Sequence, residues 1–448
     1  MMRSRRRFLA GAGLSLMSSL PAMAAFQSSG SGRLPRKSAI AADRRIGQAI
    51  ARDETIVRRK FHGDIFPLTW LSDGRQFSSL SDGYGWGVDA IDAAFYNTNG
   101  VWVTGGPLDS EFAYIPQYPS LVIEDPVRAA RYYGFSALAV DGVVYHFLSS
   151  AQEDSEAGWG WNGVKVIYSK DGGRTWNNQN GTTPVRWEPV ANRSRESLLF
   201  YKEPNFTFSL ITHAQMGKDY SENADGYVYA FATNGNIDGA MNQLVLARVK
   251  KARILDRNAY EFFAGHTRLG NVMWEREISR RDIVHTFPEG WVNKPKRGQN
   301  VVQSWLPSVV YNAPLGLYMM ASSGVGCPSS GDWFGDSRPS YLGLWVAAAP
   351  WGPWEQIYET KEWCPAGDKK ARCYSPQISP KWLAADGKSF WMIWSDFQSV
   401  CSKSEDQEAS RLMQEATSDS QRGKISKSHF VRCRPYYGFN AQRFDLKV

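Results

Sequence analysis

The feature that most constrains the fold is a hairpin pattern that occurs five times along the chain. Each occurrence has an apolar strand, a tight turn and a second apolar strand, and Asp-Gly between alternating apolar residues is a strong hairpin signal. The turns centre on residues 73, 141, 225, 313 and 386. Sheets that recur at roughly 70 to 90 residues are typical of propeller blades, which pack face to face around an axis. The sequence therefore predicts a five-bladed β-propeller.

Composition and the segments between the hairpins favour the same all-β fold. The chain has 22 Phe, 20 Tyr, 18 Trp and 40 Gly, and no long helical periodicity follows about residue 60, so we expect many short strands joined by tight turns. The five hairpins cover residues 66–80, 137–148, 207–231, 309–320 and 382–394. Further strands at 164–169, 244–249 and 342–346 are expected to be outer strands of blades.

Residues 169–176, Ser-Lys-Asp-Gly-Gly-Arg-Thr-Trp, match the Asp-box of sialidase-type propellers. In such a turn the aspartate caps the backbone of its own hairpin and the tryptophan packs between sheets. We therefore interpret Asp171 as structural, not catalytic.

The N-terminus predicts an export signal. Arg5, Arg6 and Arg7 precede Phe-Leu, a short apolar stretch covers residues 9–20, and a small-x-small cleavage pattern ends at residue 24. We interpret residues 1–24 as a signal peptide of the twin-arginine type, which exports folded proteins, and expect a periplasmic or extracellular protein. Residues 25–59 are expected to be a leader with one short basic helix over 38–59, and residues 60–448 the propeller.

Charge and hydropathy exclude two kinds of partner. Loss of the signal's four arginines lowers the formal net charge from +8 to +4, and no basic stripe or nucleic-acid motif remains. No nucleic-acid partner is expected. The apolar run of the signal is too short to span a bilayer and no other segment is long enough, so we expect no stable membrane insertion.

All five cysteines, 327, 364, 373, 401 and 433, lie in the last third of the chain. An oxidising compartment permits at most two bridges, and Cys364–Cys373 and Cys401–Cys433 are the pairings considered; free buried thiols are the alternative. The polar stretch 402–428 is expected to be a long surface excursion. No Cys-x-x-Cys or paired-histidine motif occurs, so we expect no metal site and no cofactor.

The first hairpin holds the strongest candidates for catalysis. With a three-residue loop at Gly74, Asp64 is expected directly opposite Asp82 at the open end of the hairpin. When two carboxyl groups lie this close, repulsion pushes their pKa values apart, so that one is protonated more readily and the other stays ionised. A general acid and its base or nucleophile require this difference, and glycoside hydrolysis uses such a pair. The alternative is that both are turn or capping residues beside glycines.

Six other residues are candidates for binding a substrate. Aromatic side chains stack on the apolar faces of sugar rings, although packing between blades is the commoner role. Polar residues at the start of the third hairpin could line the central funnel, or belong to a surface turn. The candidates are Trp70, Tyr84, Trp86, Lys218, Asp219 and Asp225.

Several segments in order resemble the bacterial domain-of-unknown-function family 4185. They are residues 64–86, 136–145, 217–220, 225–229, 260–263, 310–312 and 350–354. Some members of this family are glycoside hydrolases of family 183, endo-acting enzymes that cut D-arabinan, with a five-bladed propeller and an acidic pair in the first blade. The resemblance implies that Asp64 and Asp82 occupy the positions of that pair. The cysteine-bearing C-terminal region and the insertion 154–161 are not matched.

The leading hypothesis is an exported glycoside hydrolase that acts on a polysaccharide, with arabinan-like furanosides as the class the resemblance suggests. A glycan-binding propeller without turnover and a polysaccharide lyase are the alternatives that the residues leave open.

Overall fold

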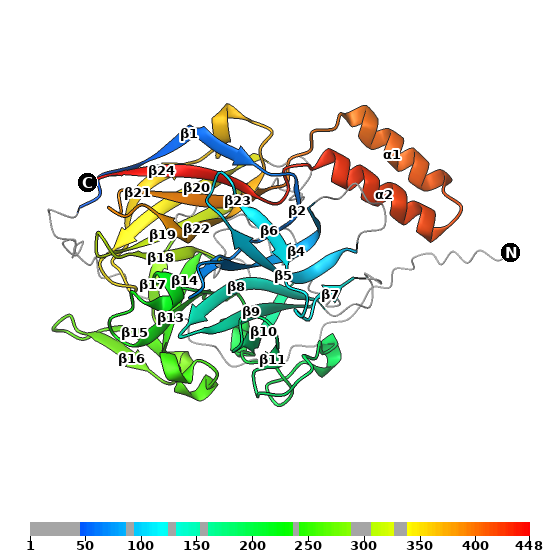
Figure 1. Ribbon diagram of the computed structural model, residues 1–448. Helices are drawn as coiled ribbons and strands as arrows, with labels where there is room; N and C mark the ends of the chain where they lie inside the picture. The colour runs from blue at the N-terminus through cyan, green and yellow to red at the C-terminus, as the bar shows by residue number, and fades with distance from the viewer. Residues whose placement is uncertain are drawn as a thin grey trace, which may run out of the picture. The chain divides into compact units, whose positions relative to one another are not determined.

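The computed structural model describes residues 45–86, 94–123, 131–152, 160–235, 242–287, 306–326 and 338–448. Within these ranges the chain forms five antiparallel sheets (Figure 1), which we name blades I to V. The predicted all-β, five-bladed propeller is confirmed. The signal peptide expected over residues 1–24 lies outside the described residues.

Each blade is built from consecutive strands, except that the last blade also takes the first strand of the chain. Blade I contains β2 (Phe61–Asp64), β3 (Thr69–Trp70), β4 (Gln76–Trp86), β5 (Tyr96–Thr104), β6 (Glu111–Tyr114) and β7 (Leu121–Val122). Blade II contains β8 (Tyr132–Val140), β9 (Val143–Gln152), β10 (Gly160–Ser169) and β11 (Asn177–Asn178). Blade III contains β12 (Ile211–His213), β13 (Tyr227–Thr233), β14 (Gln243–Lys250), β15 (Glu261–His266), β16 (Val272–Glu275) and β17 (Ile283–Thr286). Blade IV contains β18 (Ser308–Asn312), β19 (Leu317–Gly326), β20 (Arg338–Ala347) and β21 (Glu355–Thr360). Blade V contains β22 (Cys373–Leu383), β23 (Ser389–Asp396), β24 (Asn440–Lys447) and β1 (Gln48–Arg58).

Strand β1 corrects the helix expected over residues 38–59. Residues 48–58 pair antiparallel with β24, from Gln48 opposite Lys447 to Arg58 opposite Asn440, and so complete blade V. The propeller therefore begins before residue 60. The segment also contains the β-branched residues Thr55, Ile56 and Val57, which favour a strand over a helix.

Buried hydrogen bonds link each pair of adjacent blades near the axis. The donors and acceptors are side chains or backbone of the innermost strands and the residues beside them, so the five blades form a continuous polar ring inside the apolar packing. From I–II round to V–I, the bonds are Ala139 N to Thr69 Oγ1 (2.8 Å), Gln215 Nε2 to Ala137 O (2.9 Å), Thr212 Oγ1 to Pro307 O (2.8 Å), Ile378 N to Ser308 Oγ (2.9 Å) and Ser379 Oγ to Gln76 Oε1 (2.7 Å).

Apolar side chains fill the spaces between the faces of neighbouring sheets. The Asp-box shows how an outer turn contributes to this packing. Thr175 N donates to Asp171 Oδ1 at 2.9 Å, and the Trp176 ring lies 4.9 Å from Tyr118 and 5.7 Å from Phe77 of blade I. The structural role predicted for this motif is confirmed.

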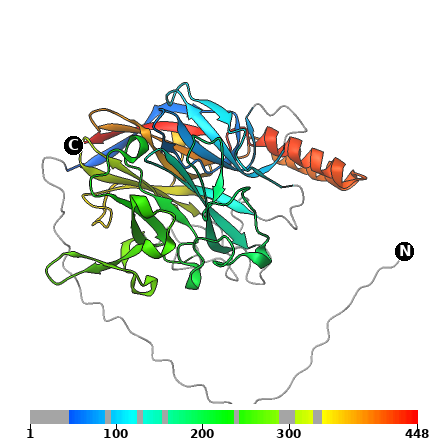
Figure 2. The ribbon, with the colours of Figure 1, turned by 60° about the horizontal axis from the view of Figure 1, so that its bottom comes forward.

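Between β23 and β24 the polar stretch of the sequence forms a helical hairpin, α1 (Lys403–Glu415) and α2 (Asp419–Cys433), which projects from the side of the propeller (Figure 2). Ser402 and Glu405 form a capping box at the start of α1. The predicted Cys401–Cys433 disulfide closes the base of the hairpin. Neither helix, nor any other in the described ranges, is long and apolar enough to cross a membrane.

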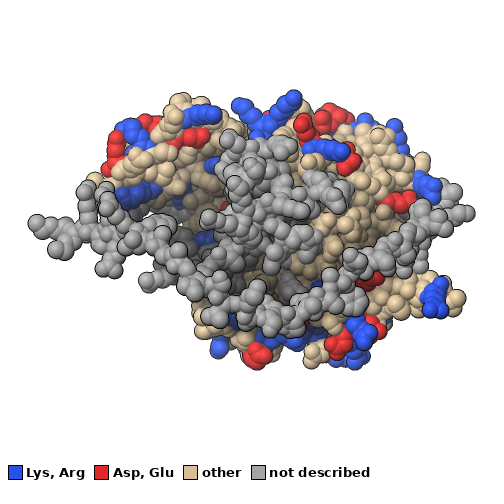
Figure 3. All heavy atoms as spheres, turned by 180° about the vertical axis from the view of Figure 1, so that it is seen from behind, with Lys and Arg blue, Asp and Glu red and all other residues tan. Residues whose placement is uncertain are grey.

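The second cysteine pairing is wrong. Cys364 and Cys373 are both free thiols, Cys373 fully buried in the core of blade V and Cys364 half-buried in the loop before it. Cys327 lies outside the described residues. Figure 3 shows that described Lys and Arg side chains alternate with Asp and Glu around the rim of one face, as the small net charge without the signal suggests.

Closure of the ring predicts unequal effects for two arginines of β1. Arg58 donates to the fully buried Asp396 of β23 at 2.8 Å, whereas Arg52 pairs with Asp445 with 41% of its side chain exposed. We expect Arg58→Ala to lower the free energy of unfolding by about 3 kcal/mol because it leaves a buried carboxylate without its cation. Arg52→Ala should cost less than about 1 kcal/mol. Urea denaturation measures both, and equal losses would contradict this account of closure.

Candidate active site

The acidic pair of blade I lies where a β-bulge interrupts the pairing of β2 with β4. Phe61 lies opposite Trp86 and His62 opposite Gly85, but Asp64 lies opposite Ser81. The expected register, which placed Asp64 opposite Asp82, is therefore wrong by one residue. It holds near the turn, where Thr69 pairs with Phe77. Three residues of β4, 82–84, therefore lie opposite the single residue Gly63 of β2, and these extra residues of β4 form the bulge.

Backbone geometry explains why the bulge forms at these residues. Asp82 has a φ of 43°, a left-handed conformation that aspartate tolerates better than most residues. A Cβ on Gly83 would lie 2.2 Å from both His62 O and Gly63 Cα, so only glycine allows the strands this close. The Asp82-Gly83 sequence thus makes the bulge and displaces Asp82 from the ladder beside Asp64.

Blade V supplies the hydrogen-bond partners of Asp64. The Tyr374 hydroxyl, on β22, donates to Asp64 Oδ2 at 2.7 Å. Tyr437, just before β24, is a second hydroxyl partner of the same carboxyl. The ring closure described above therefore brings residues 310 positions apart in the chain into direct contact. Neither tyrosine was identified from the sequence, because no motif or spacing links the last blade to the first.

The two carboxyls differ in environment. Asp64 is buried, with 8% of its surface exposed, whereas Asp82 is half-buried. Burial raises the pKa of Asp64 well above its usual range and the charge of Asp82 raises it further, while hydrogen bonds from Tyr374 and Tyr437 act in the opposite direction. Asp64 is thus suited to hold a proton at a pH at which an unperturbed carboxyl is ionised.

Asn97 of β5 positions Asp82. Its Nδ2 donates to Asp82 Oδ1 at 3.2 Å, while its Oδ1 accepts from the backbone N of Tyr132 in blade II at 2.7 Å. Because both ends of the fully buried amide are bonded, the orientation of Asn97 is fixed by a second blade.

Aromatic and basic side chains surround the pair on the side of the helical hairpin. The His62 ring lies 4.8 Å from Phe430 of α2, 5.4 Å from Tyr437 and 5.4 Å from Tyr84. Lys427 of α2 lies 4.7 Å from the centre of the Tyr84 ring. Burial lowers the pKa of His62 to about 4, an effect that the charge of Arg434 adds to, so this imidazole is neutral at pH 7.

Of the predicted substrate-binding residues, Tyr84 lies beside the acidic pair. Trp86 continues the same strand, but its ring packs within blade I, stacked on Tyr114 at 4.3 Å and 5.1 Å from Phe61. Trp70 pairs with Gln76 near the turn of the first hairpin, five residues along β4 from the partner of Asp64, or about 16 Å away. Its role in binding stays a prediction.

The other three candidates also lie at the turn end of the blades. Asp219 accepts from Gly142 N at 2.9 Å, at the turn of blade II. Asp225 accepts a hydrogen bond from the backbone N of Tyr227, in the same turn, also at 2.9 Å. Burial acts to raise the pKa of Asp73, but hydrogen bonds from Arg75 and the charges of Arg75 and Lys218 lower it below its usual value. Lys218 therefore lies near Asp73, in the turn of the first hairpin. The structure does not bring these residues next to Asp64, and their binding role stays a prediction.

Comparison with known proteins places the chain in a family. A family model described as "Domain of unknown function (DUF4185)" matches residues 135–402, more than half of the chain, and the chain belongs to that family. The resemblance identified in the sequence is confirmed. The match begins after blade I, so it does not include Asp64 or Asp82. No curated protein matches the chain.

Three solved structures give the scale of structural likeness. A Bacteroides ovatus protein aligns with a TM-score of 0.46 and 13% identity over 87% of each chain. An α-L-arabinofuranosidase from Podospora anserina, solved with cellotriose, aligns with a TM-score of 0.41 and 10% sequence identity. The alignment covers 90% of this chain and 98% of the arabinofuranosidase. A GH43_1 enzyme from Xanthomonas citri, complexed with xylotriose, aligns with a TM-score of 0.38 and 11% sequence identity. The alignment covers 89% of this chain and 90% of that enzyme.

The raised pKa of Asp64 predicts how stability changes with pH. A carboxyl whose pKa is higher in the folded than in the unfolded protein binds more protons when folded, so stability falls as pH rises between the two values. We expect Asp64→Asn to gain stability relative to the wild type as pH rises above the pKa of an unfolded carboxyl, by up to about 1.4 kcal/mol per pH unit until the pKa of the folded carboxyl is passed. Thermal or urea unfolding across this range measures the difference.

Asp73→Asn is the matched control, because the pKa of Asp73 is lowered and its effect on the pH dependence is confined to pH values below the pKa of an unfolded carboxyl, so above that pH its stability should stay parallel to that of the wild type. If the Asp64→Asn stability curve ran parallel to that of the wild type at every pH, the proposed state of Asp64 would be refuted.

Proposed function

We propose that the protein is an exported glycoside hydrolase that cleaves within a polysaccharide, with Asp64 as general acid and Asp82 as base or nucleophile. The observation that carries the proposal is the contrast within this pair. Asp64 is buried, hydrogen-bonded to Tyr374 and raised in pKa, and Asp82 is more exposed and lies close enough to raise the pKa of Asp64. A protonated and an ionised carboxyl side by side are what hydrolysis of a glycosidic bond requires.

The proposed steps follow from these positions. Asp64 donates its proton to the leaving-group oxygen of the glycosidic bond. Asp82, oriented by Asn97, either attacks the sugar carbon or activates a water molecule that does so. The distance between the carboxyl groups with substrate bound decides which of these occurs. Arabinan-like furanosides are the proposed substrate class because of the resemblance to arabinan-cutting members of the family.

The first experiment incubates the protein with a panel of bacterial and plant polysaccharides that includes D-arabinan and measures the products by mass. Released oligosaccharides with one added water are expected. We expect Asp64→Asn and Asp82→Asn each to lower the rate at least about 100-fold, the usual scale for loss of a general acid or base. Asp386→Asn, in an exposed hairpin turn where the carboxyl accepts from Lys388 N, is the control and should keep full activity.

Other outcomes separate the alternatives. Unsaturated products that absorb in the near ultraviolet would identify a lyase, and glycan retained without products would identify a binding propeller. Full activity in Asp64→Asn or Asp82→Asn would refute the assignment of the pair.

The pH dependence gives a separate prediction. If Asp64 is the acid, the rate falls as pH rises through its pKa, because only the protonated form donates. Tyr374→Phe removes a hydrogen bond that favours the ionised carboxyl, so the pKa of Asp64 rises and the alkaline limb of the pH–rate profile should move to higher pH. A shift to lower pH would contradict the role given to Tyr374.

A further inference from the structure

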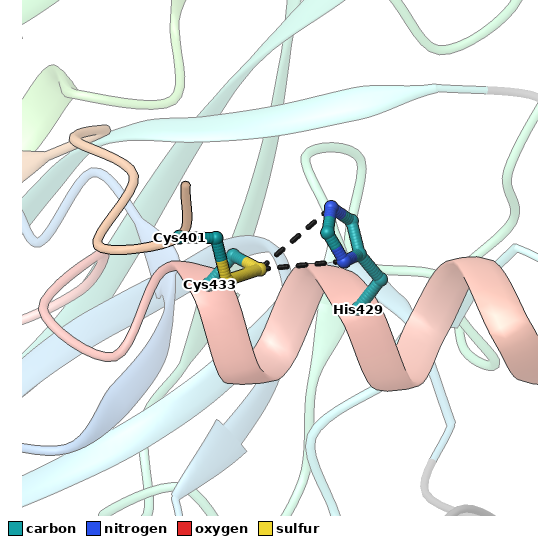
Figure 4. A group of neighbouring side chains, drawn as sticks. All are labelled: Cys401, His429 and Cys433. Atoms are coloured by element: carbon teal, nitrogen blue, oxygen red, sulfur yellow. Dashed lines mark hydrogen bonds between the residues drawn. A yellow bond between two sulfur atoms is a disulfide. The ribbon is translucent and has the colours of Figure 1, made fainter. Parts of the chain in front are cut away.

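Three potential metal ligands meet at the base of the helical hairpin (Figure 4). His429 and Cys433 are four residues apart on α2 and therefore share one face of the helix. Cys401 lies directly before Ser402, the N-cap of α1. The ligand atoms of the three residues all lie within 4.8 Å of one another, and Cys433 is fully buried. In the oxidised protein the two sulfurs are joined as a disulfide.

A carboxylate holds the ring of His429 in the way that is usual for a metal-binding histidine. Nε2 of His429 lies 2.9 Å from Oδ1 of Asp406, in the first turn of α1. Nδ1 lies 3.4 Å from Sγ of Cys433. Imidazoles that bind metals usually donate the other ring N–H to a carboxylate, which fixes the tautomer. A structural disulfide needs no such histidine or carboxylate, so this contact is independent of the cysteines.

We propose that the reduced protein binds one Zn²⁺ through the thiolates of Cys401 and Cys433 and Nδ1 of His429, with Asp406 as the outer partner of the imidazole. Thiolate and imidazole are the ligands that zinc prefers, and water takes the fourth tetrahedral position. A dithiol reductant transfers two electrons and two protons to the disulfide and is itself oxidised to a disulfide. Zinc then displaces the thiol protons. Formation of the Cys401–Cys433 bond and binding of zinc are thus mutually exclusive.

The sequence did not reveal this set because no helix was expected there. The His-x3-Cys spacing brings two side chains together only on a helix, and Cys401 and Asp406 come from the other side of a hairpin that the polar composition concealed.

Cobalt titration tests the proposal directly, since Co²⁺ replaces zinc and its thiolate complexes absorb light. We expect the protein reduced with dithiothreitol to bind one equivalent with a thiolate-to-cobalt absorption band, and the oxidised protein to lack that band. The oxidised protein keeps the free thiols of Cys364 and Cys373, so binding by those residues would appear in both forms. Circular dichroism at each step checks that the reduced protein remains folded.

Variants identify the ligands. Cys433→Ser should abolish the band, His429→Ala should weaken cobalt binding at least tenfold, and Asp406→Asn should weaken it by about 10- to 100-fold. Cys364→Ser, which removes a half-buried thiol outside the cluster, should change nothing. The proposal is overturned if the reduced wild type binds no more cobalt than Cys433→Ser, or if His429→Ala binds as tightly as the wild type.

A redox titration gives an independent measurement. Zinc that binds only the dithiol stabilises the reduced form, so it should raise the midpoint potential of the disulfide by about 30 mV for each tenfold rise in Zn²⁺ above its Kd. A midpoint that does not change with zinc would also overturn the proposal.

Discussion

The pairing of β1 with β24 is the interaction on which the rest of the structure depends. It completes blade V with the first strand of the chain, and the chain then passes directly into β2 of blade I. Two backbone bonds of 2.9 Å continue the pairing across the junction, from Arg59 N to Phe439 O and from Gly438 N to Phe61 O. Asp64 is therefore held against blade V by the same contacts that close the ring. Without closure, Tyr374 and Tyr437 would have no reason to lie near it.

The site that closure creates is costly for stability. A buried carboxyl beside a second carboxyl is unfavourable, and the hydrogen bonds from Tyr374 and Tyr437 offset only part of that cost, since the pKa of Asp64 remains raised. Asp82 adds a left-handed backbone conformation within a bulge. Backbone strain and unfavourable burial at one place, held by a rigid surrounding fold, are characteristic of functional sites.

Local signals in the sequence predicted the blades well. Asp-Gly turns, alternating apolar residues and the Asp-box each act over fewer than about 15 residues, and the structure contains the hairpins they indicate. The sequence also indicated that Asp64 and Asp82 lie close together, but it did not give their register, because the pairing set by the turn at Gly74 shifts by one residue between Thr69 and Asp64. The strand at residues 48–58 was mistaken for a helix since its partner, β24, lies at the other end of the chain. The first failure was a local irregularity within one hairpin, and the second was a contact distant in sequence.

The helical hairpin connects the chemistry of its cysteines to the acidic pair. Cys433 ends α2 and Tyr437 follows within one turn, where Tyr437 N bonds to Arg434 O at 3.2 Å. Phe430, one turn before Cys433, packs on His62. The bond between Cys401 and Cys433 therefore fixes the segment that positions a hydroxyl partner of Asp64. A zinc ion bound by the same two sulfurs would fix that segment at the same point, whereas the reduced, metal-free form would leave α2 held by noncovalent packing alone. The state of two sulfurs outside the site thus determines how firmly one wall of it is held.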